Sequence, residues 1–238
     1  MIRLLAVLLG VLAAMPAHAL TVTPITVEMN SAGPRTRAVI TITNSSNEVT
    51  AVEPSFNRVT LNEHGSTTRE EGGSDNFLIL PLQAMLQPGA TQTFRLQWVG
   101  APDIPQSESY FVTFNQLPIE GLMKKTGLTI LTAFSVAVNV APLSARPVVQ
   151  LVATSIDASG KPAITVQNPT ASHALMKDAA ITVHADGTDY PLSLADFQQA
   201  YGNGLVQPWR TRRFVLPVEL PRGVTSVTAT LNFKAPAQ

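Results

Sequence analysis

Three histidines beyond the N-terminal segment, His64, His173 and His184, are the side chains best suited to acid–base or metal chemistry. Each stands in a different segment, whereas metal sites need closely spaced ligands and nucleophilic catalysis needs a base beside the nucleophile. There is no Gly-x-Ser-x-Gly elbow and no phosphate-binding Gly-Lys-Ser/Thr loop. His173 and His184 either pair with a carboxylate in space or are solvated or merely satisfied in their hydrogen bonding, and we favour the second interpretation. The sequence therefore predicts no enzyme activity, no metal and no cofactor.

Two charged clusters are candidates for binding. Glu70, Glu71 and Asp75 offer the oxygen ligands that calcium takes, but the alternating acidic pattern of a calcium loop is missing, which favours a solvated turn. Lys124 and Lys125 precede a long apolar stretch. Two interpretations of this pair stay open, namely contacts with an acidic partner at the tip of a hairpin, or a solvated surface pair.

The stretch that follows, Leu128–Val140, is the element most in need of a partner. Apolar side chains recur at nearly every second position from Leu128 to Val140, which predicts a β-strand because side chains on a strand alternate between its faces. A typical strand has only about five or six residues, so a small sandwich leaves part of this row uncovered. Either a partner covers the surplus, or two shorter strands follow one another here.

The N-terminus indicates secretion. Met1–Ala19 combines Arg3, an apolar stretch and the small-x-small sequence Ala17-His18-Ala19, as secretory signal peptides do. The alternative, a membrane anchor, needs about 20 apolar residues, and no segment provides them, so we expect no membrane insertion. The 16 basic and 16 acidic residues balance, which argues against nucleic-acid binding. Without cysteine, packing rather than disulfides must hold a secreted fold together.

Length and turn spacing predict an all-β protein of two immunoglobulin-like β-sandwich domains. The 238 residues suit two ordinary domains, and turns rich in Gly, Pro and Asn separate short strand-like segments. Pro142 and Pro147 mark a stiff connector, which places a first domain at 20–142, a linker at 143–147 and a second domain at 148–238. Asp196–Tyr201 is either a helical turn or a short edge element. The predicted strands are Leu20–Val27, Arg37–Thr43, Thr50–Val59, Phe77–Leu82, Thr91–Val99, Tyr110–Gln116 and Leu128–Val140, then Val148–Ala153, Ala163–Gln167, Ala179–Ala185, Arg213–Val218 and Ser226–Phe233.

Several local patterns, taken in order, resemble one family. They are Ile79-Leu-Pro-Leu82, the run Leu86–Leu96, Glu108-Ser-Tyr-Phe-Val112 and Gln116-Leu-Pro-Ile119, followed by the alternating strand, with weaker matches at Val166–Thr170 and Val206–Trp209. The chain resembles the periplasmic chaperones of the chaperone-usher pathway, which assembles pili, over essentially its whole length after the leader.

This resemblance implies an L-shaped arrangement of the two domains, a periplasmic location and ATP-independent action on pilus or fimbrial subunits. A chaperone of this family inserts its long strand into a subunit's incomplete sandwich, which is a form of β-strand addition. The outer-membrane usher later replaces the chaperone's strand with the next subunit's extension. Hairpin-tip contacts would come from Lys124 and Lys125, whereas Val136–Val140 is expected to complete the chain's own core. The subunit-binding residues would be Leu128, Ile130, Thr132 and Phe134.

Departures from the family pattern concern charged residues. Members resemble one another in an Arg–Lys pair that grips the subunit's terminal carboxylate in the cleft, but the corresponding positions here, near Thr26 and at Ala137, are not basic. The divergent archaic or alternative branch also lacks that pair, and Leu117-Pro118-Ile119 looks more like that branch. Candidate substitutes, which we favour as solvated residues, are Arg35, Arg37 and Arg58.

A second set of charges is expected to tie the two domains together. Glu108 matches an acid of the family that does so, Arg95 matches the Arg in the strand before it, and Arg146 lies in the connector. We predict an ion pair of Glu108 with Arg95 or Arg146 that fixes the interdomain angle, and one-sided removal of a partly buried pair is costly. The alternative is a set of surface charges worth under about 1 kcal/mol.

Two rival classes predict other features. A secreted structural pilin or adhesin would have an incomplete sandwich and a free alternating extension at its N-terminus, whereas here the alternating strand is internal. A carbohydrate-binding sandwich would need exposed aromatic residues arranged for stacking, but Trp98 and Trp209 stand singly. The exposed apolar edge also predicts self-association of the unloaded protein through its edge strands.

Overall fold

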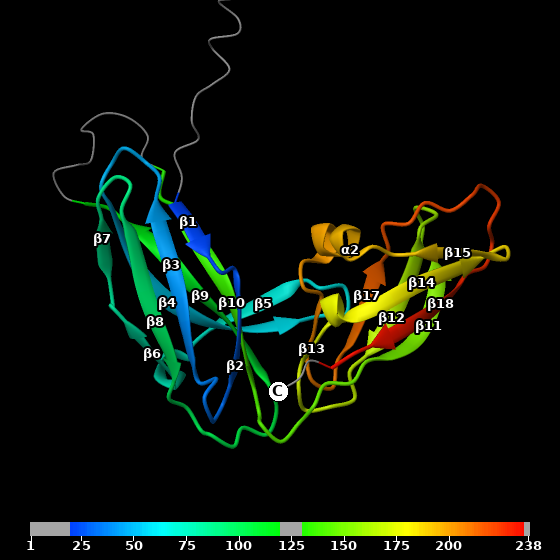
Figure 1. The fold of residues 1–238 in the computed structure, drawn as a ribbon, viewed down its shortest axis with the longest axis horizontal. Coiled ribbons are helices and arrows are strands. Elements are labelled where there is room, and N and C mark those ends of the chain that lie inside the picture. The colour runs from blue at the N-terminus through cyan, green and yellow to red at the C-terminus, as the bar shows by residue number, and fades with distance from the viewer. Residues whose placement is uncertain (1–19, 120–129, 236–238) are drawn as a thin grey trace, which may run out of the picture.

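The computed structural model describes residues 20–119 and 130–235 and consists of two β-sandwiches set at an angle to each other (Figure 1). The predicted all-β class and the L-shaped arrangement of two domains are confirmed. The leader, Lys124, Lys125 and Leu128 lie outside the described residues. Within the described residues, none of the helices combines the length and apolarity needed to cross a bilayer.

The first sandwich packs a four-stranded sheet, in the order β1-β3-β8-β6, against a six-stranded sheet in the order β2-β10-β9-β4-β5, where β7 also pairs with β4. Every second side chain of a strand points into the core between the two sheets. Phe94 of one sheet and Val112 of the other are accordingly both fully buried in one cluster. The strands are β1 (Leu20–Thr23), β2 (Thr26–Asn30), β3 (Arg37–Asn44), β4 (Thr50–Leu61), β5 (Thr67–Glu71), β6 (Phe77–Leu80), β7 (Ala84–Leu86), β8 (Thr91–Trp98), β9 (Glu108–Leu117) and β10 (Ala133–Ala141), with a 3-10 turn η1 (Ser74–Asn76).

The first predicted strand, Leu20–Val27, is two strands in the structure. β1 pairs antiparallel with β3 in one sheet, and β2 pairs parallel with β10 in the other. The chain changes sheets at Pro24 and Ile25. Proline has no N–H to contribute to a strand ladder, which is the physical reason for the interruption.

The second sandwich holds a separate core, in which Ile164, Val183 and Phe214 are fully buried. Its sheets have the orders β11-β12-β17, β13-β16 and β15-β14-β18. Of the two alternatives for Asp196–Tyr201, the helix is correct, because the Ser193 side chain caps it by accepting a hydrogen bond from the Asp196 N–H. The elements are β11 (Gln150–Ile156), β12 (Pro162–Gln167), β13 (Ala174–Leu175), η2 (Met176–Asp178), β14 (Ala179–Ala185), β15 (Thr188–Pro191), α2 (Leu194–Tyr201), β16 (Leu205–Val206), β17 (Thr211–Val215) and β18 (Thr228–Phe233).

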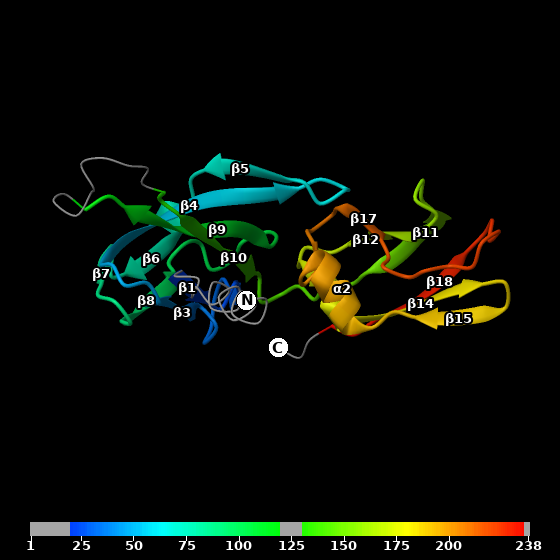
Figure 2. The same ribbon diagram turned by 90° about the horizontal axis from the view of Figure 1, so that it is seen from above.

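The β4–β5 hairpin reaches from the first domain to β17 of the second in both views (Figure 2). The Leu61 N–H donates to Gln207 Oε1 and Gln207 Nε2 donates to the Val59 carbonyl, each over 2.8 Å. The Arg213 N–H donates to the Glu63 carbonyl over 2.8 Å. The domains are therefore joined by hydrogen bonds as well as by residues 143–147, which we keep as the proposed linker.

Candidate functional site

β10 has two halves with different neighbours. Residues 137–141, here the paired half, pair with parallel β2, and of these residues 137–140 also pair with antiparallel β9. Residues 133–136, here the open half, pair with β9 only, within the part of the chain that the structure describes. The last backbone contact toward β2 runs from the Ala137 N–H to the Ile25 carbonyl over 3.0 Å. The open half therefore presents an unpaired edge to which another strand can add.

Burial of the core-facing side chains begins before the pairing with β2, at Val136 of the open half. Val136, Val138 and Val140 are fully buried in the first core, which confirms that this part of the row serves the chain's own sandwich. Phe134 is half-buried, while Ile130 is 72% exposed. Because alternate residues of a strand share a face, an extension of β10 toward the N-terminus would carry Ile130 on the face of the buried valines, with no core of its own beneath it.

The predicted strand Leu128–Val140 is shorter in the structure, where β10 begins at Ala133. The reason is the length of its partner, because Ala133 already pairs with Asn115 near the end of β9. One further backbone bond, from the Gln116 N–H to the Thr132 carbonyl over 2.9 Å, continues the ladder. The Gln116 side chain also accepts from Thr132 Oγ1 over 3.0 Å, so both the backbone and the side chain of Gln116 are polar partners of Thr132.

Glu108 lies at the start of β9, and its carboxylate pairs with Arg58 of β4 over 3.2 Å and accepts from the Tyr110 hydroxyl. Burial, together with Glu108, raises the pKa of Tyr110 well above its ordinary value. The predicted pair of Glu108 with Arg95 or Arg146 is wrong, since no ion pair among the described residues joins them. Arg95 stands on β8 of the opposite sheet, and Arg146 lines a cavity between the domains. Glu108 therefore ties two strands of one domain together, not two domains.

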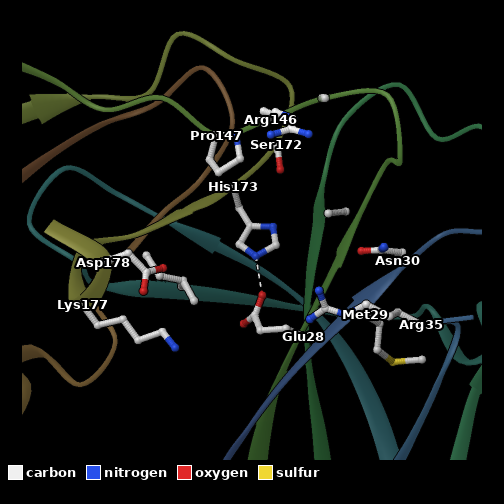
Figure 3. A pocket seen from close by; sticks show the side chains of 13 residues that line it. Glu28, Met29, Asn30, Arg35, Arg146, Pro147, Ser172, His173, Lys177 and Asp178 are labelled. Carbon is white, nitrogen blue, oxygen red and sulfur yellow. Dashed lines mark hydrogen bonds and ion pairs between the residues drawn. The ribbon is translucent and has the colours of Figure 1, made fainter. Parts of the chain in front are cut away.

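The acid that does bridge the domains is Glu28 of β2 (Figure 3). Its Oε2 lies 2.5 Å from His173 Nε2 of the second domain, and its Oε1 accepts from Asn139 Nδ2 over 2.9 Å. The alternative of a carboxylate partner for His173 was the right one, as it was for His184, whose Nδ1 lies 2.7 Å from Asp189. Sequence reasoning missed the bridge because Glu28 and His173 are brought together only by the packing of two domains.

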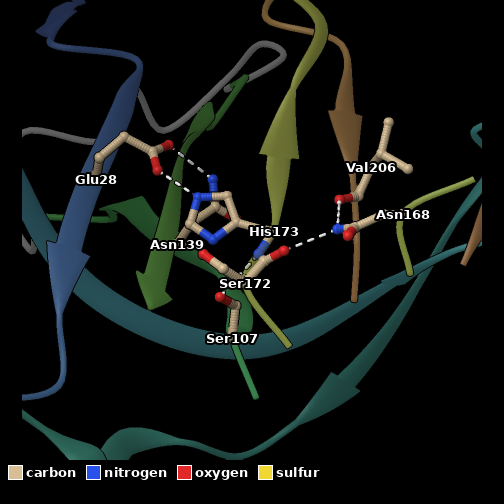
Figure 4. A network of polar contacts seen from close by, with 7 residues as sticks. All are labelled: Glu28, Ser107, Asn139, Asn168, Ser172, His173 and Val206. Atoms are coloured by element: carbon tan, nitrogen blue, oxygen red, sulfur yellow. Dashed lines mark hydrogen bonds and ion pairs between the residues drawn. The ribbon is translucent and has the colours of Figure 1, made fainter. Parts of the chain in front are cut away.

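Backbone and hydroxyl contacts extend this bridge (Figure 4). The His173 N–H donates to Ser107 Oγ over 3.0 Å, and the Ser107 N–H donates to the Ala171 carbonyl over 2.8 Å. Asn168 Nδ2 holds the loop from the other side by donating to the Ser172 carbonyl over 2.8 Å and to the Val206 carbonyl over 3.1 Å. His173 is thus fixed by both domains and is 7% exposed.

A cavity of about 170 Å³ surrounds the Glu28–His173 contact. Arg35 of the first domain and Arg146 of the connector line it (Figure 3), together with Lys177 and Asp178 of the second domain. Burial raises the pKa of the Asp178 carboxyl, against the lowering effect of Lys177. Of the other candidate substitutes, Arg58 pairs with Glu108 and Arg37 lies with Arg95 beside a shallow apolar pocket on the outer side of the four-stranded sheet.

Thr26 and Ala137 stand at the positions where the family pattern has its Arg–Lys pair. They lie directly opposite each other in the parallel pairing of β2 and β10. Both line a second interdomain cavity that also contains Arg212 of β17. Arg212 is 8% exposed. No local pattern marks it as a site residue, because Thr26 and Ala137 on the other side of the cavity come from the first domain.

Sequence comparison finds no match, either to a protein-family model or to a curated protein. Solved structures do match. CfaA, a class 5 fimbriae chaperone, has a TM-score of 0.55 at 13% identity and covers 92% of this chain and 100% of its own. A chain of the complex of the Salmonella enterica SafA pilin with the SafB chaperone has a TM-score of 0.53 at 16% identity and covers 86% of both chains.

An archaic system matches as well. A chain of the CsuC–CsuE pre-assembly complex, from the archaic chaperone-usher Csu pili of Acinetobacter baumannii, has a TM-score of 0.50 at 12% identity. The match covers 83% of this chain and 90% of that chain. The chain thus has the fold of fimbrial chaperones, at low sequence identity.

Proposed function

We propose that this chain is a periplasmic chaperone of the chaperone-usher pathway, in a divergent branch, which binds and caps pilus or fimbrial subunits and delivers them to an outer-membrane usher without ATP. The proposal includes secretion through a cleaved signal peptide and no enzymatic role. It is supported by the fold, by the order of the sequence motifs and by the two halves of β10. The observation that carries it is the open edge of residues 133–136 with the exposed Ile130 just ahead of it.

Strand addition supplies the mechanism. A subunit strand that pairs with the open half satisfies backbone N–H and C=O groups that have no strand partner on that side, and this gives affinity without regard to sequence. Specificity comes from alternate side chains, which we assign to Leu128, Ile130, Thr132 and Phe134. Burying an Ile, Leu or Phe side chain is worth roughly 1.5 to 3 kcal/mol, so a few anchors suffice for a tight complex that a competing strand can still displace.

The test is capture of a client. The chain is co-expressed with each pilin-like subunit of its genome, and the wild type is expected to co-purify with one of them. Ile130→Asp should abolish co-purification, because a carboxylate would enter an apolar groove of the subunit. Val152→Asp is the matched control, since Val152 is 57% exposed but lies on β11 of the second domain. A subunit that stays bound to the Ile130→Asp variant would rule out strand donation at this site.

A further inference from the structure

The end of β4 has an open edge that a side chain of the other domain fills. The pairing of β4 with β9 ends at Arg58, opposite Tyr110, whereas β4 continues to Leu61 and pairs there only with β5 among the described residues. On the vacated side, the Val59 carbonyl and the Leu61 N–H bond to the Gln207 amide, each over 2.8 Å. The second domain therefore supplies the partner that β9 no longer provides.

The Gln207 amide reproduces the bonds of one residue of a strand. A residue of a parallel strand donates its N–H to the carbonyl before the residue opposite it and accepts from the N–H after that residue. Gln207 Nε2 donates to Val59 and Gln207 Oε1 accepts from Leu61, which is the same pattern around Thr60. A side-chain amide can do this because it offers both a donor and an acceptor.

The turn that presents this amide is held in one conformation. The Arg210 N–H donates to the Gln207 carbonyl over 3.2 Å, and the Asn168 N–H donates to the Arg210 carbonyl over 3.0 Å. Pro208 and Trp209 are the two central residues, and Trp209 has a φ of 59°, as the third position of a type II turn requires. A large side chain rarely adopts this φ, and such strain persists only where its surroundings impose it.

The tip of the β4–β5 hairpin is ordered as well. Asn62 Oδ1 accepts from the His64 N–H over 3.0 Å and from the Ser66 N–H over 2.9 Å. The Glu63 carbonyl accepts from the N–H of Arg213 on β17, whose outer edge has no other strand partner among the described residues. Each domain thus completes an open edge of the other, through two preformed turns.

This contact, here the brace, differs in position and chemistry from the Glu28–His173 bridge. The bridge lies beside the connector, since Arg146 and Pro147 line the same cavity, whereas the hairpin crosses to β17 away from the connector in both views (Figures 1 and 2). A contact close to a hinge opposes rotation about it less than a contact farther away. The brace also consists of uncharged amide and backbone groups, which salt does not screen.

We propose that Gln207 is the positioning residue that sets the angle between the two domains, by completing β4 as a strand residue would. Without its amide, residues 143–147 act as a hinge. The angle of the wild type is then independent of ionic strength, because no charge takes part in the brace. The inference concerns the free protein and does not depend on the proposed function.

The test is a distance measurement between the domains. The chain has no cysteine, so nitroxide labels attach specifically to Thr93→Cys on β8 and Thr228→Cys on β18, both at exposed positions. Pulsed dipolar EPR of the purified protein should give one narrow distribution of label distances for the wild type. Gln207→Met, of similar length but without the amide, should broaden it about twofold or more, because relative motion is the default for weakly joined domains. Gln199→Met, at an exposed position of α2, is the matched control and should leave it narrow.

Two further variants test the geometry of the amide. Gln207→Asn keeps the amide on a side chain one methylene shorter and should broaden the distribution as well. Gln207→Glu retains an acceptor for the Leu61 N–H but no donor for the Val59 carbonyl, so an intermediate width is expected. Urea denaturation confirms that both domains of each variant stay folded, which separates a changed angle from a damaged domain.

Two outcomes would overturn the proposal. One is a distribution that stays narrow in Gln207→Met and Gln207→Asn, or that broadens in Glu28→Gln but not in Gln207→Met, which would assign the angle to the Glu28–His173 bridge. The other needs no variant at position 207: broadening of the wild-type distribution in concentrated NaCl would show that charges set the angle. Client capture does not enter either measurement, so failure of strand donation leaves this test unchanged.

Discussion

The two halves of β10 follow one sequence pattern and have opposite environments. In the paired half, Val138 is fully buried between neighbours on both sides. Ahead of the open half, Ile130 precedes the start of β10 and is 72% exposed, and it would stand on the corresponding face if β10 were extended. The difference does not come from the residues, which are similar apolar types, but from where β2 ends its pairing and where β9 runs out. An alternating pattern thus specifies a strand face, while the neighbouring strands decide whether that face is core or binding surface.

The largest expected contrast concerns stability. Val138→Asp places a carboxylate in the dry first core, so we expect a loss of more than about 4 kcal/mol in the free energy of unfolding and in practice an unfolded first domain. The same substitution at Ile130 should cost less than about 0.5 kcal/mol, because the side chain is already in water. Urea denaturation followed by the fluorescence of Trp98, which is buried in the first core, measures both. Comparable losses would mean that the two halves are not distinct.

The sequence predicted the part of the fold that depends on local pattern. Alternation located the buried faces of Val136 and Val138, whereas for Asp196–Tyr201 the sequence leaves a helical turn and an edge element open, and the Ser193 cap in the structure selects the helix. The prediction of one strand over Leu20–Val27 overlooked Pro24, although proline cannot continue a ladder.

Charged contacts were predicted poorly because they depend on tertiary geometry. Glu108 and Arg58 lie far apart in sequence and meet only because β9 pairs with β4. Glu28 acquires its partner His173 from the other domain, so no spacing in the sequence reveals that contact. A resemblance to a family predicts the fold well, but it predicts individual ion pairs only where the same residues recur.

A second prediction sharpens the comparison within the exposed segment. If residues 130–136 extend as one strand on a client, Ile130 enters the client's groove and Leu131 points to the opposite face. Ile130→Ser should therefore weaken binding of a purified subunit by roughly 1.5 to 3 kcal/mol, or about tenfold to over a hundredfold in Kd. Leu131→Ser should change it little, although Leu131 is also exposed, at 47%. Competition binding gives both values, and similar losses for the two would indicate a non-specific apolar contact.

The smallest effect probes the neighbour of the paired half, Tyr110, which lies opposite Val138 on β9. Burial and Glu108 raise the pKa of its hydroxyl, so the folded protein keeps this proton at a pH where the unfolded chain, with a pKa of about 10, loses it. The unfolded state then binds fewer protons, and the free energy of unfolding should fall above pH 10 by up to about 1.4 kcal/mol per pH unit, while this stabilisation is complete below that pH.

Tyr110→Phe should remove this share of the alkaline loss and cost about 1 kcal/mol at neutral pH, because the hydrogen bonds with Glu108 and Asn76 disappear. Tyr190→Phe in the second domain is the control, and an alkaline loss that is identical in wild type and Tyr110→Phe would contradict a protonated Tyr110 beside the paired half.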